Sequence, residues 1–305
     1  MITRADVDAA AARISGRVRV TPVVEVDAGA TWFKLELLQH TGTFKARGAF
    51  NRVLSAQESG ELDPRVGIVV ASGGNAGLAN AYAAAAVGVP ATVFVPTTAP
   101  AVKVARLRAY GATVVQAGNE YAEAFEAAVG HAAAAGAVYV HAYDQPEVAA
   151  GAGVGGAELL EQVEVDTIAV AVGGGGLMAG VAAAAEGVAK VVAVEPVRCP
   201  TLHTALRSGR PVDIGVSGVA ADSLGARRIG EIAYAVATRT GVQSVLVSDD
   251  DLIDARRRLW DEHRIVVEHG AAAAFAALTS GAYTPERGER VAILLCGANT
   301  DPSDL

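Results

Sequence analysis

The residues best suited to chemistry lie in one short stretch near the N-terminus. Lys45 stands between the aromatic Phe44 and the small Ala46, three residues after Gly42, where a helix over 44–55 is expected to begin. A lysine withdrawn from water has a lowered pKa, and its neutral amine can form a Schiff base with a carbonyl compound. The alternative is that Lys45 lies on the solvated face of an ordinary helix.

A run of four glycines forms a second candidate site. It follows an apolar segment of strand length, 166–172, and precedes a helical segment, 177–186. Backbone N–H groups at such a turn can surround one anion, and the helix dipole favours negative charge there, so we predict a phosphate site. The alternative is a tight turn that only lets strand and helix pack closely. The predicted phosphate ligands are Gly173, Gly174, Gly175, Gly176 and Leu177.

The same glycines also fit a different ligand. Gly174-x-Gly176-x-x-Ala179 has the spacing of the dinucleotide fingerprint, and Glu195 follows about twenty residues later, at the end of the next expected strand. This alternative makes the chain an NAD-dependent oxidoreductase. It leaves Lys45 and the first half of the chain without a role.

A third turn follows the apolar strand segment 66–71 and opens a helix expected over 75–87. Ser72 can be the N-cap of that helix. The hydroxyl of Ser72, the amide of Asn75 and backbone N–H groups can also hold a carboxylate. Two anion sites and one special lysine together indicate a phosphorylated cofactor and an amino-acid substrate. The predicted substrate-binding residues are Ser72, Gly73, Asn75 and Ala76.

Composition excludes several classes of partner. The chain has 305 residues, 51% of them hydrophobic, and a net charge of -8, so a large core is possible and a basic surface for nucleic acid or acidic lipid is not expected. Residues 3–6 have the pattern of a helix cap, not of an export signal, so we expect a cytoplasmic protein. In that compartment Cys199 and Cys296 are expected to be free thiols. The uncharged run 168–185 is weakly hydrophobic, so we interpret it as strand, turn and helix, not as a membrane span.

Strands and helices alternate along the chain in two series. Uniformly apolar strands are typical of parallel sheets covered by helices on both faces, so we predict an α/β fold with two three-layer α/β/α domains. The glycine-rich segment 143–156 is interpreted as a linker, and 196–230 as irregular apart from one helix. The other expected strands are 32–36, 91–95, 113–116, 138–140, 191–195, 244–247 and 291–295. The other expected helices are 3–14, 101–110, 121–135, 201–208, 249–263 and 271–279.

Together these motifs resemble the fold-type II pyridoxal-phosphate enzymes, most closely the threonine/serine dehydratase and serine racemase branch. The resemblance covers nearly the whole chain and rests on 43–49, 72–77, 173–177 and 296–299. It implies pyridoxal 5'-phosphate as the cofactor. It also implies a homodimer whose protomer has a large domain, 1–47 and 143–305, and a small mobile domain, 48–142.

The resemblance also assigns roles to single residues. Lys45 would carry the cofactor as a Schiff base and then remove the Cα proton of the substrate. Phe44 would stack on the pyridine ring, Asn75 would contact the ring hydroxyl, and 173–177 would hold the phosphate. Cys296 would lie at the ring nitrogen, where a neutral thiol favours loss of the β-hydroxyl over transamination. The alternative for Cys296 is a buried small hydrophobic residue.

The implied activity is that of a threonine/serine dehydratase, an ammonia-lyase. It would convert L-threonine to 2-oxobutyrate, or L-serine to pyruvate, with release of ammonia. The sequence does not favour one of these substrates over the other. A β-replacement enzyme, such as a cysteine or threonine synthase, is the alternative within the same cofactor class.

Three positions depart from the family pattern. Gly73 replaces the second serine of the racemases, so we expect no efficient racemisation, and Ala76 replaces a histidine, which changes the carboxylate pocket. Glu195 resembles one ligand of a divalent-cation site, but Thr201 stands where an aspartate is expected, so no metal is predicted. The chain ends soon after its last strand, and we expect no regulatory domain.

Overall fold

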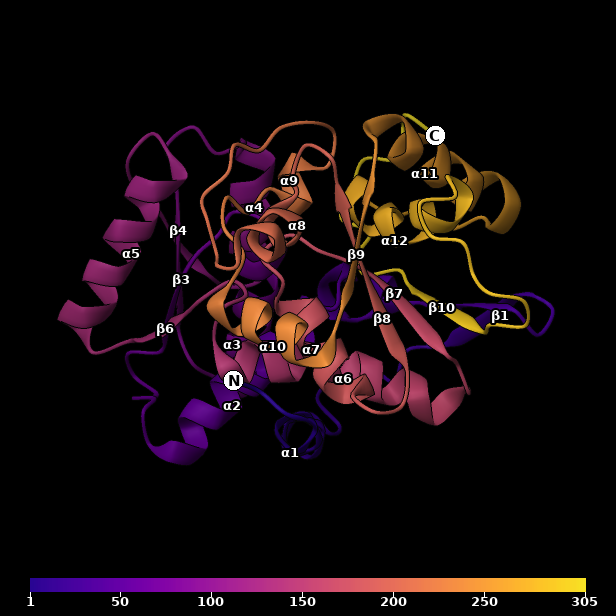
Figure 1. The fold of residues 1–305 in the computed structure, drawn as a ribbon. Coiled ribbons are helices and arrows are strands. Elements are labelled where there is room, and N and C mark those ends of the chain that lie inside the picture. The colour runs from indigo at the N-terminus through magenta and orange to yellow at the C-terminus, as the bar shows by residue number, and fades with distance from the viewer.

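Two mainly parallel sheets organise the chain (Figure 1). The structure, a computed structural model, describes residues 1–305. The smaller sheet has the strand order β5-β4-β3-β6, and the larger has the order β1-β2-β10-β7-β8-β9, in which only β1 and β2 pair antiparallel. The strands are β1 (Val23–Asp27), β2 (Thr31–Lys34), β3 (Ile68–Ala71), β4 (Ala91–Val95), β5 (Thr113–Gln116), β6 (Val138–Val140), β7 (Thr167–Ala171), β8 (Lys190–Pro196), β9 (Gln243–Val247) and β10 (Val291–Leu294).

Helices cover the faces of both sheets, which confirms the predicted α/β class. In Figure 1 the helix α5 flanks the smaller sheet at the outer end of the molecule, and α11 and α12 lie together over the larger sheet. The helices are α1 (Arg4–Ile14), α2 (Lys45–Ser59), α3 (Asn75–Val87), α4 (Ala101–Ala109), α5 (Tyr121–Ala135), α6 (Pro146–Gln162), α7 (Gly176–Ala185), α8 (Thr201–Ser208), α9 (Ala221–Leu224), α10 (Glu231–Thr240), α11 (Asp249–His263) and α12 (His269–Thr279), with short 3-10 turns η1 (Glu36–Leu38) and η2 (His40–Gly42).

Strand β3 shows why these sheets need helices on both faces. All four of its residues are buried. Val69 and Ala71 cluster with residues of α5, whereas Ile68 and Val70 point the other way into the main core with α3. Because successive side chains of a strand alternate between the two faces, a strand apolar at every position requires cover on each side.

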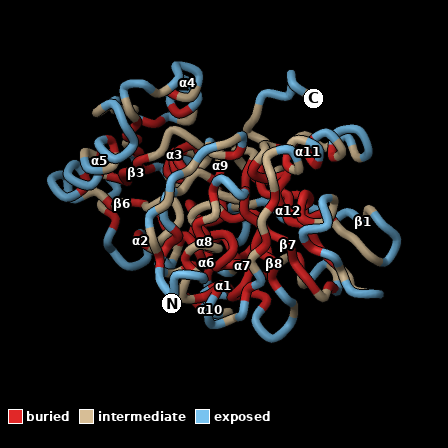
Figure 2. The backbone as a smooth tube through the Cα atoms, turned by 45° about the horizontal axis from the view of Figure 1, so that its top comes forward, coloured by how far each residue is buried: buried red, intermediate tan, exposed pale blue.

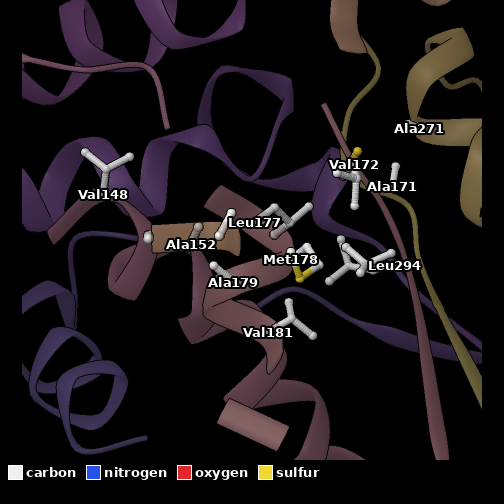
Figure 3. Packing of buried hydrophobic residues seen from close by; sticks show 14 of the residues in the cluster. Val148, Ala152, Ala171, Val172, Leu177, Met178, Ala179, Val181, Ala271 and Leu294 are labelled. Carbon is white, nitrogen blue, oxygen red and sulfur yellow. The ribbon is translucent and has the colours of Figure 1, made fainter. Parts of the chain in front are cut away.

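The main core includes residues of both sheets, and every residue of helix α7 is buried. Figure 2 shows β7, β8 and α7 buried along most of their length, while α5 and the outer part of α4 are exposed. In Figure 3, Met178 of α7 lies between Leu177 and Leu294, the last residue of β10. No helix has both the length and the apolar composition needed to cross a membrane. The run 168–185 is β7, a turn and α7, as predicted.

The expected linker 143–156 is wrong, because helix α6 begins at Pro146 and continues to Gln162. Its glycines serve close packing, not flexibility. A Cβ at Gly153 would lie 2.5 Å from the carbonyl oxygen of Gly180 in α7, and a Cβ at Gly180 would lie 2.2 Å from that of Ala149. Helices α6 and α7 therefore touch backbone to backbone, and only glycine permits this distance.

The segment 196–230 contains two helices, α8 and the short α9, whereas one was expected, and strand β1 and helix α10 have no prediction from the sequence. Strand β1 is a partly exposed antiparallel edge, so it lacks the apolar run that marks the central strands. Helix α10 follows Gly230, which offers no side chain as a cap. Its first N–H groups, those of Glu231 and Ile232, donate instead to the carboxylate of Asp144, which comes from a distant part of the chain.

We expect Gly153→Ala to lower the free energy of unfolding by about 1–3 kcal/mol, because the added methyl forces α6 away from α7. Gly130→Ala is the matched control, since Gly130 lies in α5 with no atom within 4 Å of an added Cβ. It should instead stabilise the protein by about 0.5–1 kcal/mol. Denaturant unfolding of both variants measures these changes, and equal free energies of unfolding would contradict the close contact between α6 and α7.

Candidate active site

The predicted site lies where the strand order of each sheet reverses. In the larger sheet the chain runs from β7 outward to β8 and β9, and then returns to place β10 on the other side of β7. The smaller sheet repeats this pattern, with β4 and β5 on one side of β3 and β6 on the other. Crevices at the carboxyl ends of strands at such reversals are the usual ligand sites of parallel sheets. The turns after β3, β6, β7 and β10 contain Ser72, Tyr143, Gly173 and Cys296.

Lys45 is the first residue of α2, and its loop is tied to the end of β10. The N–H of Phe44 donates to the carbonyl of Cys296 at 3.0 Å, and Thr43 forms a bridge with Gly297. The Nζ of Lys45 donates to the carbonyl of Ala142 at 2.8 Å and lies 5.0 Å from the centre of the Phe44 ring. Lys45 thus lies between the two sheets, and the solvated-face alternative is wrong.

Burial lowers the pKa of Lys45 from its ordinary value to about 8, although the carboxylate of Glu268 acts in the opposite direction. A substantial fraction of the amine is therefore neutral near physiological pH. Burial also raises the pKa of the Cys296 thiol well above its ordinary value, so this thiol stays neutral. Both cysteines are free and buried.

A cluster of paired, mostly buried charges includes Arg47, two residues after Lys45. Arg47 is fully buried and donates to both oxygens of Glu36 at 2.7 Å, while its Nη1 lies 3.1 Å from a carboxylate oxygen of Glu158. Lys34, also fully buried, pairs with Glu158 at 2.5 Å and donates to the carbonyl of Thr21 at 2.8 Å. Two positive and two negative groups therefore connect β2, η1, α2 and α6.

The glycine turn between β7 and α7 combines close packing with free N–H groups. A Cβ at Gly174 would lie 2.4 Å from the ring of Tyr143, and Gly175 has φ +87°, so both positions favour glycine for steric or conformational reasons. The N–H groups of residues 174–177 nevertheless donate to no protein atom. Four successive free donors at a helix N-terminus fit the phosphate of a cofactor.

The turn after β3 offers a second set of donors. Helix α3 is capped by Gly74, not by Ser72, whose hydroxyl instead accepts the N–H of Gly74 at 3.3 Å. The N–H groups of residues 75–77 donate to no protein atom. The side chain of Ala76 is buried and has no polar group, so only its backbone can donate a hydrogen bond to a ligand. Gly77 is required here, because a Cβ would lie 2.0 Å from the carbonyl oxygen of Ser72.

Two further residues complete the site, and the sequence analysis assigned neither of them a role. The Nδ2 of Asn75 donates to both carboxylate oxygens of Glu268 at 3.0 Å. The Oδ1 of Asn75 accepts from Asn299 at 2.8 Å. An acidic residue before a helix is common, so the sequence offered no signal for Glu268. Asn299 lies in the motif 296–299, in which only the cysteine received a role.

The carboxylate of Glu195 is bound to the first turn of α8 and is not part of the site. It is fully buried, and its carboxylate accepts N–H groups of Leu202 and His203 at 2.7 and 2.8 Å and the Thr201 hydroxyl at 3.0 Å. These donors belong to the first turn of α8, so Glu195 acts as a cap for that helix. It is not available to a ribose, which removes the main support for the dinucleotide alternative.

The residues present fit pyridoxal phosphate. Lys45 supplies an amine that is partly neutral, residues 174–177 supply donors for one anion, and Cys296 supplies a buried neutral group. A narrow apolar pocket surrounds the stem of the lysine. It is lined by Phe44, Lys45, Gly48, Ala142, Tyr143, Val148, Ala152 and Gly176.

We expect cofactor-free protein to bind pyridoxal phosphate covalently at a rate that rises with pH and levels off above about 8. The reason is that only the neutral amine of Lys45 reacts with an aldehyde, and its pKa is about 8. Stopped-flow absorbance gives the rate, and borohydride reduction with peptide mapping identifies the lysine. A rate that keeps rising to about pH 10 would show an ordinary lysine instead.

Comparisons with known proteins agree with this geometry. A family model described as pyridoxal-phosphate dependent enzyme matches residues 14–297. Phenylserine dehydratase of Ralstonia pickettii is 40% identical over 301 residues, which cover 95% of this chain and 91% of that protein. L-threonine ammonia-lyase of Thermotoga maritima is 33% identical over 311 residues, with coverage of 99% and 76%.

A solved structure gives the same result. The crystal structure of a threonine deaminase from T.th. superposes with a TM-score of 0.90 at 33% identity, and the match covers 99% of this chain and 100% of that one. Fold, site and sequence thus lead to one assignment, which confirms the predicted cofactor: the chain belongs to the family of pyridoxal-phosphate dependent enzymes.

Proposed function

We propose that this enzyme is an ammonia-lyase that deaminates L-threonine, L-serine or a related β-hydroxy amino acid. One observation carries the proposal: a neutral buried thiol, Cys296, follows the strand whose end is hydrogen-bonded to the loop of Lys45. A neutral partner at the ring nitrogen disfavours a long-lived carbanion and favours prompt loss of the β-hydroxyl. The names of the relatives, phenylserine dehydratase and L-threonine ammonia-lyase, support the same reaction class.

Each part of the site has a proposed task. When bound, pyridoxal phosphate supplies an aldehyde that joins to amines and a ring that withdraws electrons from the substrate Cα. Residues 173–177 hold the phosphate, and Phe44 packs against the ring. The turn that contains Ser72, Gly73, Asn75 and Ala76 holds the substrate carboxylate, and the Asn75 amide also contacts the ring hydroxyl. Lys45 would hold the cofactor through its Nζ, and the same amine would be the base that takes the proton from the substrate Cα.

Two positions limit the reaction. Gly73 offers no acid on the opposite face of Cα, so we propose that racemisation is inefficient. Ala76 has no polar side-chain group, which leaves the carboxylate to backbone N–H groups and to Ser72 and Asn75. The small domain 48–142 is proposed to move over the cofactor and exclude water. A homodimer and a cytoplasmic location stay predictions, and sedimentation tests the first.

Wild-type protein should show a yellow absorption band that changes when L-threonine is added, while 2-oxobutyrate and ammonia form in equal amounts. L-serine and L-threo-phenylserine, assayed in parallel, establish which β-substituent is preferred. We expect Lys45→Ala to lower kcat more than about a thousandfold, because it removes both the covalent attachment and the base. Circular dichroism should show that the variant keeps the wild-type fold.

Three outcomes would contradict the proposal in different ways. Retained turnover in Lys45→Ala would exclude its role. Keto acid that forms only with a second, nucleophilic substrate would identify a β-replacement enzyme. A colourless protein that takes up no pyridoxal phosphate would remove the proposed function as a whole.

A further inference from the structure

A chain of hydrogen bonds leads from the molecular surface to Asn75. Arg106, on the exposed side of α4, donates to the Oδ1 of Asn299 at 2.7 Å. The Nδ2 of Asn299 donates to the carbonyl of Thr41 and to the Oδ1 of Asn75, both at 2.8 Å. Asn75 in turn donates to Glu268 at 3.0 Å. The chain thus runs through two side-chain amides and ends at a carboxylate.

The two ends of this chain fix its direction. An arginine only donates, whereas a carboxylate and a backbone carbonyl only accept. Each asparagine amide between them therefore has one favourable orientation, in which its oxygen faces Arg106 and its nitrogen faces Glu268. Turning either amide over would place two donors or two acceptors against each other. Every member of the chain supports the same orientation of Asn75.

The chain also connects the two halves of the molecule. Arg106 and Asn75 belong to helices packed on the smaller sheet, whereas Asn299 follows β10 and Glu268 precedes α12 on the larger sheet. A second contact from α4 makes the same crossing, since Lys103 pairs with Asp222 of α9 at 2.5 Å. Helix α4 is therefore held against the larger half at two points, and one of them continues to the site.

We propose that Arg106 is a positioning residue: through Asn299 it holds the Asn75 amide in the orientation that serves the site, so that this orientation depends on the docking of α4. The inference rests on the proposed contact of Asn75 with cofactor and substrate. Arg106 and Asn299 border an open polar hollow of about 520 Å³, so water competes for their hydrogen bond and its loss has a moderate effect.

The test uses the full-length holoenzyme in a double-mutant cycle. Arg106→Ala and Asn299→Ala should each lower kcat/KM, the first by about three- to tenfold, and should weaken pyridoxal-phosphate binding and move its absorption maximum in the same direction. In the Asn299→Ala background the further change Arg106→Ala should have no effect, because the connection is already broken. Arg106→Lys keeps a donor and should restore part of the loss.

Arg108→Ala is the matched control, since Arg108 lies on the same helix, is exposed and forms no hydrogen bond or ion pair with another side chain. It should leave the absorption maximum, the cofactor affinity and kcat/KM unchanged. Additive effects of Arg106→Ala and Asn299→Ala, or equal effects of Arg106→Ala and Arg108→Ala, would overturn the inference while the proposed function stands. Failure of the wild-type protein to bind pyridoxal phosphate would overturn both.

Discussion

The position of the site depends on one buried charge, the guanidinium of Arg47, which requires partners of opposite charge. Arg47 lies two residues after Lys45, inside the protein, where an unpaired guanidinium would cost several kcal/mol. Its partners Glu36 and Glu158 come from η1 and α6, and Glu158 must also satisfy Lys34 of β2. Because three buried charged groups and the partly buried Glu158 pair with one another, the position of the first turn of α2 is fixed by these contacts. The reactive amine is held by residues that need not touch any ligand.

The rest of the site follows from a repeated topology. Each sheet has a central strand, extends to one side, and later receives a strand on the other side. The turn after the central strand is glycine-rich in both sheets, and each opens a helix with free N–H groups, at 75–77 and at 174–177. The returning strands supply Ala142, which accepts from Lys45, and Cys296. The same arrangement thus occurs in both sheets, and the amine of Lys45 lies between them.

The sequence predicted the parts of this arrangement that leave local signals. Strands that are apolar throughout, such as β3 and β7, and the glycine turns after them are visible in the residues themselves. The four motifs at 43–49, 72–77, 173–177 and 296–299 together indicated the family and the cofactor, and the two series of strands and helices indicated the fold class. Local signals also placed α3, α5 and α8 at their observed bounds.

What the sequence could not provide depends on contacts between distant segments. Glycines at 151–156 look like a linker until a second helix, α7, is known to pass within backbone contact of them. Helix α10 is capped by Asp144, and Asn75 is oriented by Glu268, in each case over a long separation in the chain. No local sequence pattern marks a residue whose partner is so distant in the chain, so its role can be recognised only in the folded structure.

The two rows of free N–H groups, at 75–77 and 174–177, allow one ligand to link the two halves of the molecule. They belong to different halves, and each leaves donors that water alone must satisfy when no anion is present. A guest with a phosphate at one end and a carboxylate at the other would therefore act as a cross-link between the halves. The bound ligand would then add to the rigidity of the protein around it. We expect the ligand-bound protein to unfold in one transition, whereas the two halves of the ligand-free protein unfold separately.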